Sequence, residues 1–201
     1  MHAPLVVLGG GPGGYAAAFM AADLGMEVTL VEKDSRLGGT CLLRGCIPSK
    51  ALLHVGRVVA EVREMQDWGV HFSAPKIDIN AVRDRKEKVI DALTGGLAQL
   101  AKRRNVKVVQ GQGMFTASNT LEVIQQDAGS QKITFDHCIL ASGSRPARIP
   151  AFDIGSSRVM DSTGALQLED IPESLLVVGG GYIGLEMGTV YAELGVSSLS
   201  S

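Results

Sequence analysis

Apolar residues along the first part of the chain follow the period of a strand, then of a helix, then of a strand again. Leu5 to Leu8 is a short apolar run that ends in a glycine-rich segment, residues 9–14. The alanine-rich stretch from Tyr15 to Leu24 favours a helix, and Gly25 is a typical helix stop. Glu27 to Glu32 alternates as a strand does and finishes on an acid. The pattern predicts a strand, a glycine turn, a helix and a second strand.

The spacing of the glycines gives this unit a chemical meaning. Gly9 allows a tight turn, Gly11 lets the backbone approach a pyrophosphate, and Gly14 lets the helix pack closely on the strand. Glu32 lies eighteen residues after Gly14, where a carboxylate can accept a hydrogen bond from a ribose 2′-hydroxyl. The alternative is that Glu32 is an ordinary solvated acid at a strand end. The full context of strand, turn, helix and acid favours a dinucleotide-binding unit.

Residues 38–50, GGTCLLRGCIPSK, hold two of the three cysteines at a predicted helix start. We expect Thr40 or a neighbour to cap the helix and Pro48 to lie in or near its first turn. The positive end of a helix dipole favours thiolate chemistry. Cys41 is expected to be partly exposed, where it can attack a substrate disulfide, and Cys46 to lie deeper, against a cofactor.

Two alternatives exist for these cysteines. The first is that they are ordinary thiols without a role, although their flanking residues make the motif specific. A zinc site built from Cys41, Cys46, His54 and Cys138 is the other alternative, but the spacing matches no common zinc motif. We therefore expect a redox dithiol and no metal site.

Two long helices are predicted after the dithiol. Residues 51–65 space their apolar positions as a helix does, so the dithiol opens this helix. Residues 67–72 break the pattern, and Trp68, near this turn, has no assigned role. A second amphipathic helix is expected over residues 77–104, loosened near Thr94 to Gly96, with its alternating charges on a solvated face.

From Val106 onward the period changes to two. Short strands separated by glycine, asparagine or aspartate predict an antiparallel meander over 106–111, 113–117, 120–125 and 132–137. A further apolar strand, residues 138–141, is expected to include Cys138 as a small core residue. Small residues at 142–146 would let the backbone return beside the first nucleotide site.

The opening motif recurs late in the chain. Residues 149–161 are punctuated by proline and glycine and are interpreted as a linker. After Leu175, Gly179, Gly181 and Gly184 repeat the spacing of the first turn. The expected fold is α/β: a Rossmann-like dinucleotide-binding domain with a parallel sheet and an antiparallel meander over 1–148, then the incomplete start of a second such unit over 149–201.

Composition excludes several classes of protein. Hydrophobic residues make up 45% of the 201 residues and charged residues 20%, which excludes a disordered tail protein. A net charge of −2 gives no electrostatic footprint for nucleic acid or an acidic membrane. Three cysteines do not indicate a secreted disulfide scaffold. With no predicted leader and no membrane-spanning stretch, a soluble cytoplasmic protein is expected.

Two dinucleotide units with a C-x4-C dithiol in the first resemble the pyridine nucleotide-disulfide oxidoreductases. The segments GGTC-x3-GCIPSKALL, DALTGGLAQLAK, ASGSRP and GGGYIGLEMGTVYAELG are most similar to bacterial-type dihydrolipoamide dehydrogenases. The resemblance implies an FAD-dependent enzyme that oxidises dihydrolipoamide to lipoamide with NAD as acceptor. Cys41 would be the interchange thiol and Cys46 the charge-transfer thiol facing the flavin.

The resemblance also implies cofactor residues and partners. The implied FAD site is Gly9, Gly11, Gly14, Glu32, Lys33, Gly39, Thr40, Cys41, Lys50, Gly113, Ser142, Gly143 and Ser144. The implied NAD site is Gly179, Gly181, Gly184 and Glu186. Implied partners are the dihydrolipoyl groups of 2-oxo acid dehydrogenase complexes or of the glycine cleavage system, with no nucleic acid or membrane partner.

Compared with that family, the chain is expected to be truncated. The family's later part completes the NAD domain and the FAD site and forms the homodimer, which is expected to be absent here. Two alternatives remain open: a non-catalytic FAD-binding fragment, and a related enzyme such as a glutathione or mercuric reductase.

Overall fold

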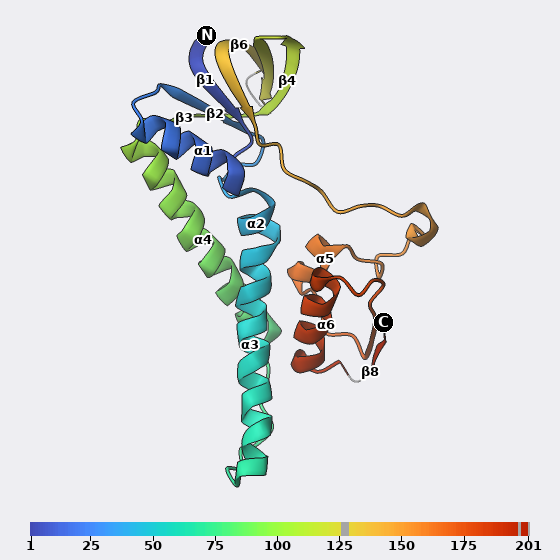
Figure 1. The fold of residues 1–201 in the computed structure, drawn as a ribbon. Helices are drawn as coiled ribbons and strands as arrows, with labels where there is room; N and C mark the ends of the chain where they lie inside the picture. Colours follow the sequence, from blue (N-terminus) through green and yellow to red (C-terminus); the bar gives the residue numbers. More distant parts are fainter. Residues whose placement is uncertain (126–128, 197, 201) are drawn as a thin grey trace. The chain divides into compact units, whose positions relative to one another are not determined.

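The computed structural model describes residues 1–125, 129–196 and 198–200, with side chains described as far as residue 196. The elements in chain order are β1 (His2–Leu8), α1 (Pro12–Asp23), β2 (Val28–Glu32), α2 (Gly39–Arg44), α3 (Cys46–Glu64), α4 (Ile79–Arg103), β3 (Lys107–Gln110), β4 (Gln112–Ala117), β5 (Thr120–Gln125), β6 (Gly129–Leu140), α5 (Ser162–Gln167), β7 (Ser174–Leu176), α6 (Tyr182–Leu194) and β8 (Ser198–Ser200) (Figure 1). Short 3-10 helices span Met65–Trp68 and Pro150–Phe152.

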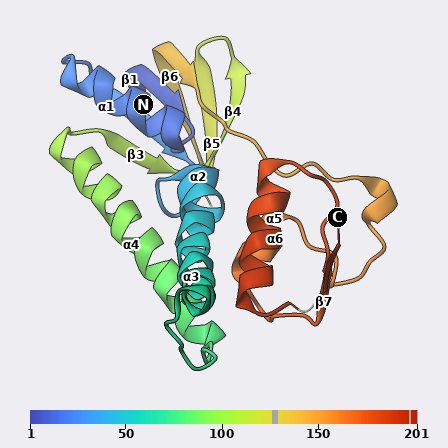
Figure 2. The ribbon, with the colours of Figure 1, turned by 60° about the horizontal axis from the view of Figure 1, so that its bottom comes forward.

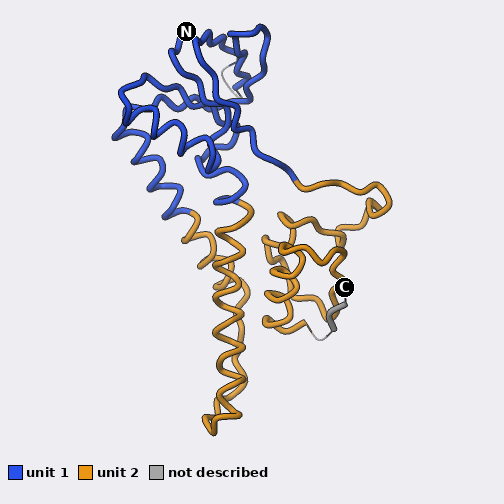
Figure 3. The backbone as a smooth tube through the Cα atoms, in the orientation of Figure 1, with its two compact units in different colours: residues 1–43, 91–145 blue, residues 44–90, 146–201 orange. Residues whose placement is uncertain are grey.

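These elements form two compact units (Figure 3). The first unit holds residues 1–43 and 91–145, and the second holds residues 44–90 and the described residues from 146 onward. The division falls between Cys41 and Cys46, and it also divides α4, whose first turns belong to the second unit. Each unit is described below by itself.

The first unit is built on a six-stranded sheet in the order β3-β2-β1-β6-β5-β4. Strands β3, β2, β1 and β6 are parallel, while β5 pairs antiparallel with both β6 and β4. Figure 2 shows β4, β5 and β6 continuing the sheet beyond β1. The α/β fold with a parallel sheet and a meander is therefore confirmed.

Two details of the predicted sheet were wrong. Residues 106–111 were expected to begin the meander, but β3 instead pairs parallel with β2 at the sheet edge. The strands expected at 132–137 and 138–141 are one strand, β6, which pairs with β5 in its first half and with β1 in its second. A local pattern with period two does not distinguish these pairings, because partner strands are chosen by long-range packing.

A core cluster of the first unit is formed by side chains of the sheet's own strands. Fully buried residues such as Val6, Leu121 and Ile133 form it, and Cys138 packs against it as a partly buried side chain, as predicted. Helix α1 packs on the parallel strands, and Arg104 joins α1 through Asp23, with Nε–Oδ1 at 2.9 Å, and through the ring of Phe19. The dinucleotide-type helix is thus fixed to the sheet on which its glycine turn begins.

The second unit has its own core between α3, α5 and α6. Leu52 of α3 is buried with residues of the other two helices, including Leu166, Val190 and Tyr191.

Helix α4 runs without interruption through Thr94 to Gly96, so the predicted loosening there was wrong. The glycines at 95 and 96 have ordinary helical backbone angles, which an amphipathic helix of this length tolerates.

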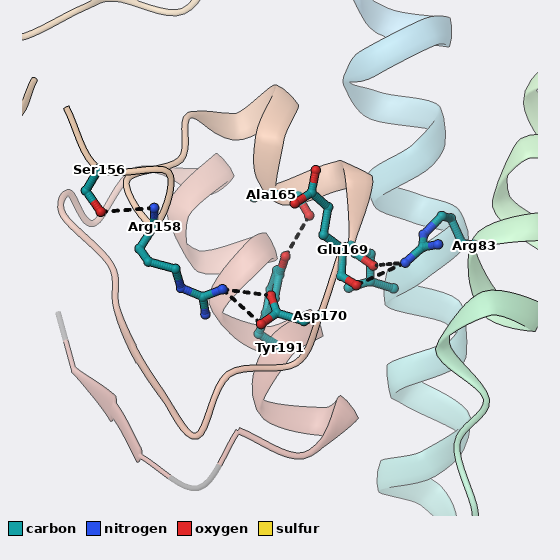
Figure 4. Close-up of polar contacts among 8 residues, drawn as sticks. Arg83, Ser156, Arg158, Ala165, Glu169, Asp170 and Tyr191 are labelled. Atoms are coloured by element: carbon teal, nitrogen blue, oxygen red, sulfur yellow. Dashed lines mark hydrogen bonds and ion pairs between the residues drawn. The ribbon is translucent and has the colours of Figure 1, made fainter.

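A polar cluster fixes helix α5, which the sequence pattern did not predict. The carbonyl groups of residues 165–169 all accept hydrogen bonds from side chains of α4 and α6. Tyr191 Oη donates to the carbonyl of residue 165 at 2.9 Å, and the buried Lys86 Nζ donates to that of residue 166 at 2.7 Å. Arg83 donates to the carbonyls of residues 167, 168 and 169, and Figure 4 shows Arg83 beside Glu169 and Tyr191 beside Ala165. Cations at a helix C-terminus satisfy carbonyls that have no partner within the helix.

Candidate functional site

The first glycine turn lies between β1 and α1, at the carboxyl end of the parallel strands. Gly9 has a φ of +106°, and a side chain there would meet the carbonyl oxygen of Ala141 at 2.1 Å. A Cβ on Gly14 would lie 1.7 Å from the Gly9 carbonyl oxygen. The predicted structural roles of Gly9 and Gly14 are therefore confirmed. At Gly11 the nearest atom to an added Cβ is 3.7 Å away, on Gly39, so the turn is more open here.

Glu32 lies at the end of β2 beside this turn. Its side chain is buried, with Oε2 accepting from the Gly10 N–H at 2.5 Å and Oε1 from the Asp34 N–H at 2.8 Å. A carboxylate oxygen accepts more than one hydrogen bond, so each retains capacity for a hydroxyl donor. Helix α1 begins at Pro12, and Gly11 before it provides no side-chain cap for the N–H groups of the first turn. The turn thus combines a helix N-terminus suited to phosphate with a fixed acid suited to a ribose.

The segment that leads into the dithiol lies against this turn. The Gly38 N–H donates to the Gly10 carbonyl at 2.8 Å, and a Cβ on Gly39 would come within 2.6 Å of the Gly11 Cα. Thr40, or a neighbour of it, was expected to cap the dithiol helix. Instead its hydroxyl donates to the Ser144 carbonyl at 3.3 Å, and helix α3 has no side-chain cap. The predicted cap was wrong because the segment forms two helices, α2 and α3, which are separated at Gly45. The sequence pattern did not indicate this break.

Two other predicted cofactor segments lie around the same strands. Residues 142–144 follow the end of β6, directly after the alanine that contacts Gly9. Gly113 lies on β4, where a side chain would meet Leu8 at 2.6 Å and Val31 at 3.4 Å. Lys33 is exposed immediately after β2. The structure therefore gathers the predicted first-unit residues around the carboxyl ends of β1, β2 and β6.

The two cysteines fall on different helices. Cys41 lies within α2 and is half-buried, whereas Cys46 is the first residue of α3 and is exposed. The expectation that Cys46 would be the deeper of the two was wrong. Burial raises the pKa of Tyr15, and the nearby Cys41 thiol raises it further. Sequence reasoning missed Tyr15, whose only signal was its place directly after the glycine turn.

The start of α3 forms the second-unit part of the candidate site. Gly45 precedes Cys46, and Pro48 occupies the first turn of the helix, as predicted. The Ser49 hydroxyl, which is buried, donates to the Cys46 carbonyl at 3.1 Å. The first turn of α3 is therefore held closed by a side chain that follows the thiol by three positions.

Lys50 and Glu186 join α3 to α6. Lys50 Nζ lies 2.5 Å from Glu186 Oε1. The hydrogen bond to Lys50 lowers the pKa of Glu186, while burial opposes this shift and Ser49 adds to it. Reciprocally, the hydrogen bond to Glu186 raises the pKa of Lys50, desolvation opposes this rise, and the charges of Glu186, Cys46 and Tyr182 add to it. Both residues were predicted, but for two separate nucleotide sites. Their 136-residue separation left no sequence signal for the ion pair.

The second glycine turn repeats the local geometry of the first. Gly179 has a φ of +108°, close to that of Gly9, and a Cβ on Gly184 would lie 2.4 Å from the Gly179 carbonyl oxygen. Helix α6 begins after Gly181, again without a side-chain cap, and Tyr182 beside it is exposed. No atom lies within 4 Å of a Cβ placed on Gly179, Gly180 or Gly181 in the part of the chain that the structure describes.

Two further features of the described residues concern metal ions and membranes. Within residues 1–125 and 129–196, no group of three or more His, Cys, Asp or Glu side chains is arranged to hold a metal ion. No helix in the described part of the chain is long and apolar enough to cross a membrane.

Comparisons with known proteins agree with this geometry. A model of the pyridine nucleotide-disulphide oxidoreductase family matches residues 3–199. The chain is 54% identical over 195 residues to a dihydrolipoyl dehydrogenase of Vibrio parahaemolyticus and 53% identical to one of Vibrio cholerae, covering 97% of this chain and 41% of each relative. The chain thus spans about two-fifths of the length of these curated relatives.

A solved structure has a similar fold. The HOCl-induced flavoprotein disulfide reductase RclA from Escherichia coli, in a Cu(II) complex, matches with a TM-score of 0.84 at 28% identity. The match covers 99% of this chain and 42% of RclA. Fold, signature residues and relatives point the same way, and the chain belongs to the pyridine nucleotide-disulphide oxidoreductase family.

Proposed function

We propose that this chain is the FAD-binding and dithiol-bearing part of a dihydrolipoyl dehydrogenase, which oxidises dihydrolipoamide to lipoamide with NAD as the final acceptor. One observation carries the proposal: the segment that begins the dithiol motif at Gly39 lies directly against the dinucleotide turn at Gly11. A redox thiol helix and a nucleotide turn in backbone contact are what a dithiol–flavin enzyme requires. The high identity to relatives of that name supports the substrate class.

The residues around the first turn suit FAD. The space beside Gly11 and the uncapped start of α1 fit a pyrophosphate, and the buried Glu32 fits a ribose hydroxyl. When bound, FAD would supply two-electron chemistry between the dithiol and a nicotinamide. The residues proposed to hold it are Gly9, Gly11, Gly14, Glu32, Lys33, Gly39, Thr40, Cys41, Lys50, Gly113, Ser142, Gly143 and Ser144.

The thiols supply the first half of the reaction. One thiolate of dihydrolipoamide attacks the sulfur of Cys41 in a Cys41–Cys46 disulfide, forms a mixed disulfide and releases Cys46 as a thiolate. The second thiolate of the substrate then displaces Cys41, so that lipoamide leaves as a disulfide and both cysteines are reduced. The positive end of α3 and the ammonium of Lys50, one turn after Cys46, both favour the released thiolate.

The second glycine turn is proposed for NAD. Gly179, Gly181 and Gly184 provide the turn and the start of α6, and Glu186 fixes α6 to α3 through Lys50. Accordingly, residues 1–148 are proposed as the FAD-binding part and 149–201 as the beginning of the NAD-binding part. The proposed partners are the dihydrolipoyl groups of 2-oxo acid dehydrogenase complexes or of the glycine cleavage system.

A spectroscopic experiment tests this function. The purified chain is mixed with FAD, separated from excess FAD, and then treated with dihydrolipoamide while its visible absorbance is recorded. The chain is expected to retain FAD, and the substrate is expected to bleach the oxidised flavin band. Cys46→Ser should retain FAD but resist bleaching, because it has no disulfide to pass electrons.

Cys138→Ala is the matched control, because Cys138 lies in β6, partly buried against the core of the first unit, and takes no part in the proposed chemistry. Bleaching of Cys46→Ser at the rate of the unaltered chain would contradict the dithiol route. A chain that retains FAD but is not bleached would be the non-catalytic FAD-binding fragment, and a chain that retains no FAD would refute the proposed site.

A further inference from the structure

The first glycine turn is bordered by the wall loop, residues 33–38, which joins β2 to α2. The Leu37 side chain is buried, and a Cβ placed on Gly10 would meet it at 2.7 Å. The Gly38 N–H donates a hydrogen bond to the Gly10 carbonyl at 2.8 Å. The wall loop therefore lies against the turn at which the pyrophosphate is proposed to bind, and a dinucleotide that reaches this turn has to pass the loop.

The other elements at this turn are firmly held. Helix α1 is fixed through Arg104, whose Nε lies 2.9 and 3.1 Å from the two carboxylate oxygens of Asp23. The Arg104 guanidinium also lies 5.3 Å from the centre of the Phe19 ring, which adds a cation–π attraction. Strand β2 is paired on both sides, with β1 and with β3. Among α1, β2 and the wall loop, the loop is therefore the element that we expect to move.

The wall loop has the features of a movable segment. Lys33, Ser35 and Arg36 are exposed to solvent. The chain leaves the loop through Gly38 and Gly39, whose φ values are +133° and +56°. Glycine accepts the range of backbone angles that a hinge passes through. The loop thus has an exposed outer side and a pair of hinge glycines where it enters α2.

An ion pair joins the wall loop to helix α4. Arg36 Nη1 lies 2.5 Å from Asp91 Oδ1, and both residues belong to the first unit. The two side chains are 42% and 65% exposed, so the pair adds little to the stability of the unit. One turn before Asp91, Lys88 is exposed and Glu87 pairs with Lys86 at 3.0 Å. A contact of Lys88 with Asp91 would not hold the loop, because both residues lie on α4.

We propose that the wall loop is a lid over the first glycine turn and that the Arg36–Asp91 pair is its latch. FAD enters and leaves when this pair separates and the loop turns about Gly38 and Gly39. The inference rests on the proposed function, since it takes FAD as the ligand of this turn. The pair is intact in the free and in the bound chain, so it slows binding and release equally and leaves the affinity unchanged.

Stopped-flow measurement of flavin fluorescence tests the lid with the full chain freed of FAD. In Arg36→Gln and in Asp91→Asn, association and dissociation should both become about threefold faster, the factor expected for loss of an exposed ion pair, while the Kd stays unchanged. Arg36→Asp combined with Asp91→Arg should restore both rates. Lys102→Gln, which removes an exposed cation of α4 within the first unit, is the charge-matched control and should keep the rates of the unaltered chain.

Amide hydrogen exchange tests the same movement without FAD. The Gly38 N–H should exchange about threefold faster in Arg36→Gln than in the unaltered chain, while the amides of β2 keep their rates. A chain that binds no FAD would refute the proposed function, and the exchange at Gly38 would then decide on the latch. Faster exchange in Arg36→Gln would support the latch, and equal exchange would overturn it.

Three kinetic results would overturn the proposal. Faster dissociation with unchanged association would mean that Arg36 holds bound FAD rather than the loop. Opposite changes of the association rate in Arg36→Gln and Asp91→Asn would mean that these charges act on the anionic cofactor from a distance. Unchanged rates in both variants would mean that the pair does not limit the opening of the loop.

Discussion

The two glycine turns have the same local backbone but different surroundings. Gly9 and Gly179 have φ values of +106° and +108°, and in both turns the third glycine packs on the carbonyl of the first. Around the first turn, however, added side chains at Gly9 and Gly10 would collide with Ala141, Leu37 and Glu32. Around Gly179 to Gly181 the described residues leave open space.

The difference separates two sources of a nucleotide site. The turn itself follows from glycine spacing and the start of a helix, so a short segment of sequence suffices to form it. The wall around it requires strands and loops from distant parts of the chain: β2 brings Glu32, and β6 brings Ala141 and the segment 142–144. We infer that the first turn has both the backbone conformation and the surrounding residues that a nucleotide site needs. The second turn has the same backbone conformation, but the described residues do not enclose it.

Gly14→Ala should have one of the two largest effects on stability. Its Cβ would lie 1.7 Å from the Gly9 carbonyl oxygen, and overpacking of this kind costs about 3 kcal/mol. Gly184→Ala, with the equivalent distance at 2.4 Å, should cost less, about 1 to 2 kcal/mol. Urea denaturation measures both, with Gly13→Ala and Gly180→Ala as controls from the same turns. An equal loss in Gly13→Ala would show that the turn tolerates no side chain anywhere.

Gly9→Ala and Gly179→Ala isolate the contribution of the surrounding strands. Both substitutions force an alanine into a left-handed conformation, which costs about 1 to 2 kcal/mol. Only Gly9→Ala adds a collision, with the Ala141 carbonyl at 2.1 Å, so its total loss should reach about 3 kcal/mol. Equal losses of unfolding free energy in the two variants would contradict the claim that only the first turn is enclosed.

Glu32→Gln should destabilise the first unit by about 2 kcal/mol, because the amide leaves one buried backbone N–H without its acceptor. The measurement is the denaturant midpoint of the first unit. Glu186→Gln is the matched change at the partly exposed acid of the second unit, and a smaller effect is expected there. A larger loss of unfolding free energy in Glu186→Gln than in Glu32→Gln would contradict the structural role given to Glu32.

Lys86→Met tests how the second unit holds α5 without an enclosing sheet. The substitution keeps the volume but removes the donor to the Leu166 carbonyl, at an expected cost of about 1 to 2 kcal/mol. Lys88→Met, at an exposed position of the same helix, should leave stability within about 0.5 kcal/mol of the unaltered chain. Thermal unfolding of the two variants side by side measures the difference, and identical curves would contradict the role of the polar cluster.

The pH dependence of the Lys50–Glu186 pair should give the smallest effect, because the Lys50 side chain is 58% exposed. The lowered pKa of Glu186 makes its contribution present above the ordinary pKa of 4.5 and lost as the pH falls through the folded value. The raised pKa of Lys50 makes its contribution present below 10.5 and lost as the pH rises through the folded value. Protection of α6 from proteolysis should therefore be strongest near neutral pH. In Glu186→Gln, this protection should depend less on pH. A profile unchanged in that variant would exclude the pair.

The sequence predicted what depends on local spacing. Both glycine turns, the position of Pro48 and the order of strands and helices around the first turn follow from residues close together in the chain. The wrong or missed features depend on distant partners: the parallel pairing of β3, the contact of Thr40 with Ser144, and the ion pair of Lys50 with Glu186. Helix α5 was missed for the same reason, since side chains of α4 and α6 satisfy its carbonyls.

The most direct test of the central claim is the affinity for FAD of one glycine variant in each turn. Gly11→Ala and Gly181→Ala place the same methyl group at equivalent positions, and in neither does the added Cβ come closer than 3.7 Å to an atom of the described residues. Titration calorimetry should show FAD binding weakened at least about tenfold in Gly11→Ala and unchanged in Gly181→Ala. Weakening in Gly181→Ala, or equal affinity in both variants, would contradict the assignment of the first turn to FAD.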